Sequence, residues 1–116
     1  MAVKTYVPTE VRFEDRSIEG TRLVTLYDPD ASGRSGSMTT PNALEADTRG
    51  GPLVFVGVRD GKTWRVTLPE IAVRNRSAMG FEYAILQPIS ETLLAEDGGV
   101  ERGRVEKGLG DYGATF

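Results

Sequence analysis

The strongest constraint on the fold is the segment 53–68, in which two β-rich runs flank the dipeptide Asp60-Gly61. Asp-Gly is a favoured pair for a two-residue type I′ turn, because both central residues must adopt positive φ. A turn at this point fixes the register of a β-hairpin by counting, and it places Phe55 opposite Val66. One face of the hairpin is then wholly apolar and consists of Leu53, Phe55, Trp64, Val66 and Leu68.

The second face of the same hairpin is mixed. It carries Val54, Val56 and Val58 on one strand, against threonine and arginine residues on the other. Two interpretations remain open. The strand is either buried on both faces, as in a sandwich with a loop folded over it, or forms a patch that another subunit covers. The three valines are therefore candidate interface residues.

The remaining apolar patterns predict further short strands at residues 6–13, 21–27, 71–73 and 81–86. The first two are expected to pair antiparallel, and Pro8 predicts an edge position for the first, because proline cannot donate to a ladder. A polar turn is expected at 74–77. Ser90 and Gly98 match the N-cap and the C-terminal stop of one short helix.

Two segments are poor in large apolar residues and rich in glycine and other turn-forming residues. Residues 28–52 predict a long central loop with one helical turn that starts at Thr40-Pro41. Residues 99–116 predict an extended arm that cannot bury itself. The spaced apolar residues of this arm, which are candidate interface anchors, are Leu109, Tyr112 and Phe116.

These elements predict a mostly β fold. We expect a small single-domain antiparallel β-barrel or β-sandwich of about six strands, with one short helix, a long central loop and an extended C-terminal arm. The β domain is expected to span residues 1–98. A chain of 116 residues can bury such a core without disulfides or metal.

The chain contains no histidine and no cysteine. This composition excludes Ser-His-Asp and Cys-His catalysis, and it excludes zinc sites built from imidazole or thiolate ligands. An enzyme would have to use carboxylates, lysine or tyrosine. We therefore expect a protein that is not an enzyme, with no catalytic, cofactor-binding or metal-binding residues.

Three patterns match parts of functional motifs, and each of them is incomplete. The acids Glu10, Glu14, Asp15 and Glu19 lie around a predicted turn, where acids are usually solvated. Residues 28–33 match the opening of a calcium loop, but position 12 of that loop is Thr39 instead of a bidentate glutamate. Residues 108–113 match G-x-G-x-x-G without a following helix, so a dinucleotide site is not expected.

Charge and hydropathy bear on possible partners. The net charge is −3, so no overall field attracts nucleic acid, although a local patch of basic residues can form on a sheet face. The candidates for such a patch are Arg59, Lys62, Arg65, Arg74 and Arg76. No apolar run approaches the length of a membrane span, and no secretion signal is recognised; we expect a soluble protein that is made in the cytoplasm.

The sequence therefore favours a structural or assembly protein that binds copies of itself and other structural proteins. Missing catalytic residue types, a long polar loop and a glycine-rich arm are typical of components that order on contact with neighbours. By analogy of architecture, we expect a component of a virus particle, such as a phage capsid-decorating, head–tail connector or tail protein. The alternative is a small β-barrel that binds nucleic acid or a small ligand.

Overall fold

A computed structural model describes residues 3–95 of the chain. The described residues form ten β-strands and no helix, so the mostly β prediction is confirmed, whereas about six strands with one helix is wrong. The strands are β1 (Lys4–Phe13), β2 (Arg16–Ser17), β3 (Leu23–Leu26), β4 (Gly36–Thr39), β5 (Arg49–Gly50), β6 (Leu53–Arg59), β7 (Lys62–Leu68), β8 (Ile71–Ser77), β9 (Gly80–Ile85) and β10 (Ser90–Ala95).

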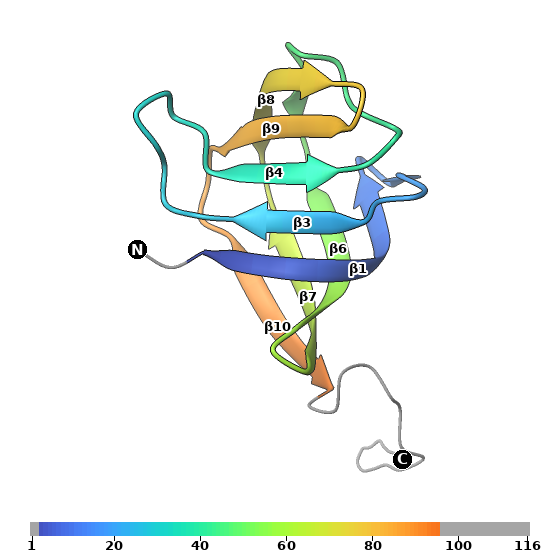
Figure 1. The fold of residues 1–116 in the computed structure, drawn as a ribbon. Helices are drawn as coiled ribbons and strands as arrows, with labels where there is room; N and C mark the ends of the chain where they lie inside the picture. Colours follow the sequence, from blue (N-terminus) through green and yellow to red (C-terminus); the bar gives the residue numbers. More distant parts are fainter. Residues whose placement is uncertain (1–2, 96–116) are drawn as a thin grey trace.

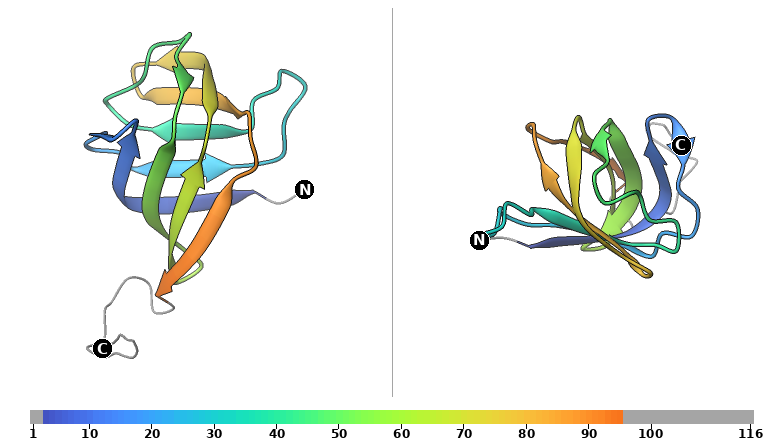
Figure 2. Two further views of the ribbon diagram at one scale, coloured as in Figure 1. Left: turned by 180° about the vertical axis from the view of Figure 1, so that it is seen from behind. Right: turned by 90° about the horizontal axis from the view of Figure 1, so that it is seen from above.

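One antiparallel sheet contains all ten strands and curls into a half-barrel (Figure 1). The strand order is β10-β7-β6-β1-β3-β4-β9-β8-β5, and β2 pairs with β1 beside this path. Strand β1 joins the two halves, because residues 4–6 pair with β3 and residues 7–13 pair with β6. Viewed from above, the half with β6 and β7 stands up from the half with β3 and β4 (Figure 2).

The β6–β7 hairpin has the register that the sequence predicts. Asp60 and Gly61 adopt φ values of 54° and 71°, as a type I′ turn requires. Phe55 lies opposite Val66, and all seven residue pairs of the hairpin follow the predicted count. The predicted apolar face is buried in the core except for Trp64, which is only partly buried.

The core lies between the two halves of the curled sheet. Tyr6 packs edge-on against Phe55, with ring centroids 5.0 Å apart, and both side chains are fully buried. In the other half, Phe81 and Tyr83 form a tilted aromatic pair at 5.8 Å. Aromatic side chains from β1, β6 and β9 thus supply much of the buried apolar area, which is the main source of stability.

The segment predicted as a short helix at 90–98 is instead strand β10 as far as Ala95. Its backbone pairs with β7, so that Glu91 lies opposite Val66 and Leu93 lies opposite Trp64. The capping pattern at Ser90 is a local signal worth about 1 kcal/mol, and pairing along a whole strand outweighs it. The predicted arm at 99–116 lies outside the described residues.

The predicted long loop at 28–52 contains two short strands. Strand β4 lies between β3 and β9. Strand β5 pairs with β8, and its Arg49 lies opposite Ala72. Gly36 makes this insertion possible, because a Cβ atom there would lie 2.3 Å from the ring of Tyr83. The predicted helical turn at Thr40 is also wrong, because residues 40–47 form bends and one turn but no helix. The Thr40 amide donates to the carbonyl of Met79, which ties this segment to the β8–β9 turn.

Two predictions for individual strands are also wrong. Strand β1 is not an edge strand, because it has partners on both sides. Pro8 is tolerated because β1 has a strand partner on one side only at this point: its pairing with β3 ends at Tyr6, and its pairing with β2 begins at Arg12. The expected polar turn at 74–77 is the second half of β8, which continues as an exposed ribbon paired with β9.

Candidate functional site

Five residues form a polar and aromatic cluster between β1, β6, β7 and β10. We call this the Glu91 cluster, and it consists of Lys4, Tyr6, Arg59, Trp64 and Glu91. Lys4 and Tyr6 come from the start of β1, and their side chains reach Glu91 of β10, which is 85 or more residues away in sequence. The cluster therefore ties the edge strand β10 to the centre of the sheet.

Glu91 is the acceptor at the centre of this cluster. The Tyr6 hydroxyl donates to Oε2 of Glu91, and the Lys4 ammonium lies 3.1 Å from Oε1. Burial alone would raise the pKa of Glu91, but the hydrogen bonds from Tyr6 and Lys4 outweigh that effect and hold the pKa below its ordinary value. Burial, together with the bond to Glu91, raises the pKa of Tyr6 to about 12.

Arg59 completes the cluster by stacking between two aromatic rings. Its guanidinium carbon lies 5.3 Å from the ring centroid of Tyr6 and 4.9 Å from that of Trp64. Such cation–π contacts stabilise a partly desolvated cation. Nε of Arg59 and Nε1 of Trp64 are buried donors without an acceptor in the part of the chain that the structure describes. Arg59 is thus a packed side chain rather than an exposed basic contact.

Replacing Glu91 by glutamine is expected to lower the free energy of unfolding by about 1 kcal/mol at pH 7, because the ion pair with Lys4 is lost. The folded-state pKa of Glu91 lies below the ordinary value of 4.5, so its contribution is present above pH 4.5. The contribution disappears as the pH falls through the lowered folded-state pKa.

Urea unfolding of the native chain and of Glu91→Gln at several pH values measures this effect. The stability difference should shrink steadily as the solution is acidified below pH 4.5. The matched control is Glu10→Gln, which changes an exposed acid on β1 and should leave stability unchanged. A Glu91→Gln effect that is equally large at all pH values would contradict the role assigned to the charge.

Strand β10 forms one edge of the sheet and is its most exposed apolar strand. It pairs with β7 on one side, and no strand among residues 3–95 covers the other side, which we call the β10 edge (Figure 2). Leu93 is 40 % exposed and Leu94 is 42 % exposed. Glu91, the one charged residue of β10, is engaged with Lys4 and Tyr6. An apolar edge of this kind offers unpaired backbone groups to another strand.

The opposite edge of the sheet has a different character. Strand β5 covers only Ile71 and Ala72 of β8. Val73 is buried, and its amide donates to the carbonyl of Thr48. Beyond Val73, β8 is exposed and carries Arg74, Asn75, Arg76 and Ser77. Charged side chains of this kind protect an edge strand against pairing with other chains. The two edges are therefore chemically distinct, and only the β10 edge is apolar.

The predicted interface valines lie on the outer face of β6, away from the main core cluster. Val54, Val56 and Val58 are all partly buried. Val7 of β1 lies opposite Val58 and is 57 % exposed, so it extends this apolar surface. Their role as an interface stays a prediction. The other three predicted interface residues, Leu109, Tyr112 and Phe116, lie outside the described residues.

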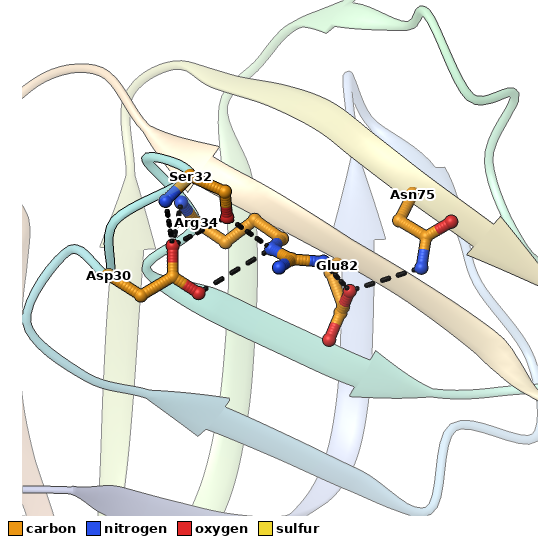
Figure 3. Close-up of polar contacts among 5 residues, drawn as sticks. All are labelled: Asp30, Ser32, Arg34, Asn75 and Glu82. Carbon is orange, nitrogen blue, oxygen red and sulfur yellow. Dashed lines mark hydrogen bonds and ion pairs between the residues drawn. The ribbon is translucent and has the colours of Figure 1, made fainter.

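The loop that resembled a calcium site uses its acid to hold its own backbone (Figure 3). Oδ1 of Asp30 accepts hydrogen bonds from the amides of Ser32 and Arg34, at 2.9 Å and 3.0 Å. The hydrogen bond from the Ser32 hydroxyl, supported by these amides, holds the pKa of Asp30 below its ordinary value.

Arg34 extends this network to the sheet. Its Nη1 lies 2.8 Å from Oε1 of Glu82, which also accepts a hydrogen bond from Asn75 at 3.2 Å. The network fastens the β3–β4 loop to β8 and β9, a structural task that explains both carboxylates.

The other candidate motifs do not assemble into a reactive site. Glu14 and Asp15 form the tight β1–β2 turn with φ values of 51° and 64°, while Glu19 accepts a hydrogen bond from Ser17 at 2.6 Å. Within residues 3–95, no three His, Cys, Asp or Glu residues converge to hold a metal ion. The predicted basic residues are divided between two parts of the strand order: Arg59, Lys62 and Arg65 lie on the β6–β7 hairpin, and Arg74 and Arg76 lie on β8, next to the last strand in that order.

The β10 edge and the Glu91 cluster are the features that sequence reasoning missed. The sequence pattern places Leu93 and Leu94 on a helix, and it offers no acid as a partner for Tyr6. The only available signal was the β-branched Thr92 between Glu91 and Leu93, an alternation too short to decide the matter.

Comparison with models of protein families, with curated proteins and with solved structures finds no match for this chain. The described residues include no helix with the length and hydrophobicity needed to cross a membrane.

Proposed function

We propose that this chain is a non-enzymatic structural protein, which associates with copies of itself or with other structural proteins through the β10 edge. The observation that carries this proposal is the contrast between the two sheet edges. Strand β10 presents Leu93 and Leu94 to solvent, whereas β8 presents Arg74 and Arg76. Soluble β proteins often place charges on their edge strands, and an apolar edge strand without an exposed charge is a site for strand addition.

The outer face of the neighbouring strands supports the same proposal. Val7, Val56 and Val58 are exposed or partly buried on the side of the sheet that faces away from the core. They add apolar surface on β1 and β6 to that of the β10 edge. Apolar surface of this kind, ringed by polar residues, is characteristic of protein–protein contacts.

The narrower form of the proposal is a component of a virus particle, such as a phage capsid-decorating, head–tail connector or tail protein. It is supported by the small all-β domain, by an edge available for contacts, and by the glycine-rich composition of residues 99–116. Recovery of the chain in purified particles of the virus that encodes it would test this form.

Nucleic-acid binding, the alternative that the sequence raised, has less support. A single-stranded nucleic acid needs exposed aromatic rings beside basic residues. Phe81 and Tyr83 are buried in the core, and Trp64 already stacks on Arg59.

Sedimentation velocity over a range of protein concentrations tests the proposed function. The native chain should shift to dimers or larger species as concentration rises. Leu94→Lys should shift the association to at least about tenfold higher concentration, because a charge on an edge strand opposes strand addition.

Leu23→Lys provides the matched control. Leu23 is 40 % exposed, close to the value of Leu94, but it lies on β3, which has strand partners on both sides. This variant should associate like the native chain. A native chain that sediments as a monomer at every concentration would refute the proposed function.

A further inference from the structure

The β10 edge leaves one side of a strand without a partner among residues 3–95. We propose that two chains associate by antiparallel pairing of their β10 strands about a twofold axis at Leu93, so that the two Leu93 residues face each other. This inference rests on the proposed function, since it names the partner of the β10 edge. It joins two half-barrels into one continuous sheet.

Charge favours the pairing of two β10 edges over the pairing of two β8 edges. Pairing two β8 edges would set Arg74 and Arg76 of one chain beside those of the other, and like charges across strands are destabilising. Two β10 strands bring together only one charge each, Glu91, and Lys4 of the same chain already neutralises it at 3.1 Å. Pairing of identical edges also consumes both of them, so the assembly closes as a dimer.

The register follows from which face each residue occupies. Glu91 and Leu93 lie opposite Val66 and Trp64, so they share the inner face of the sheet. Directly opposite residues in an antiparallel pair share a face. An axis at Leu93 therefore continues the apolar row formed by Trp64 and Leu93 into the second copy.

An axis at Glu91 is disfavoured. With the axis at Glu91, two carboxylates would face each other across the new ladder, which is destabilising. With the axis at Leu93, each Glu91 instead lies beside the far end of the second copy's β10, beyond the bulge that separates Leu93 from Ala95. Leu93, which is 40 % exposed in the single chain, is then covered by its counterpart.

Disulfide trapping tests this arrangement cleanly, because the chain contains no cysteine. Single-cysteine variants Leu93→Cys and Ser90→Cys are made in the full chain and exposed to mild oxidation. In the proposed dimer, the two thiols introduced by Leu93→Cys lie within disulfide reach of each other. Those introduced by Ser90→Cys lie roughly 20 Å apart along the strands. Leu93→Cys should form covalent dimers at least about tenfold faster than Ser90→Cys.

Arg76→Cys on the β8 edge is the second control and should crosslink as slowly as Ser90→Cys. Sedimentation of each reduced variant shows whether the chain still associates. Association without preferential crosslinking of Leu93→Cys would refute this pairing and leave the proposed function intact. Absence of association by the native chain would instead refute both.

Discussion

Replacing Phe55 by alanine should lower the free energy of unfolding by about 3–5 kcal/mol. Phe55 is completely buried, and its ring packs edge-on against Tyr6 with centroids 5.0 Å apart. Truncation removes the transfer free energy of the ring and leaves a cavity between the two halves of the sheet. Urea unfolding followed by Trp64 fluorescence measures the change, since Trp64 is the only tryptophan of the chain.

The neighbouring residue provides the control for this prediction. Val56 lies on the opposite face of β6 and is only partly buried. Val56→Ala should cost about 1 kcal/mol or less, because few packed atoms are lost. Equal costs at the two positions would contradict the assignment of the core to the Phe55 face of the hairpin.

Replacing Gly80 by alanine is expected to be nearly as damaging, at about 3 kcal/mol, although it adds a single methyl group. Gly80 adopts a φ of 152°, and a Cβ atom at this position would lie 1.9 Å from the carbonyl oxygen of Met38. The clash involves backbone, so β4 and β9 would have to separate. Thermal unfolding should show a large decrease in Tm.

Gly33→Ala is the control that distinguishes the cost of the steric clash from the cost of backbone strain at Gly80. Gly33 also has positive φ, at 84°, but nothing lies within 4 Å of its Cβ position. Gly33→Ala should therefore cost only about 1 kcal/mol, the strain of a left-handed conformation. If Gly80→Ala were no worse than Gly33→Ala, the close approach of Gly80 to Met38 would be wrong.

The β6–β7 hairpin shows what this sequence predicts well. Asp60-Gly61 closes the turn locally, and the alternation on both sides agrees with the register it sets. Turn chemistry and hydrophobic pattern thus point to the same answer, and each depends on residues close together in the chain. The burial of Phe55 and Val66 on one face of the hairpin follows directly from this register.

Strand β10 shows why the remainder could not be predicted. Its partner β7 lies more than twenty residues earlier, and nothing within residues 90–95 specifies that pairing. Ser90 and the two leucines match a helix as well as a strand. The short strands β4 and β5 could not be predicted for the same reason, since turn-rich segments become strands only where a neighbouring strand is available to pair with them.

The sequence predicts the outer valines but neither the β10 edge nor the Glu91 cluster, because these two depend on contacts between residues far apart in the chain. The outer valines Val54, Val56 and Val58 could be placed on one face by counting from the turn. The β10 edge could not, because an edge is a property of the strand order and not of any one segment. Glu91 and Tyr6 meet only when the whole sheet has curled.

Hydrogen–deuterium exchange of the β10 backbone amides, at low and at high protein concentration, tests association through this edge most directly. If chains associate through β10, amides within residues 90–95 should exchange more slowly at high concentration, while the β3 amides should exchange at the same rate in both samples. Exchange in β10 that does not depend on concentration, in samples where the chain is shown to associate, would contradict the assignment of the contact to this edge.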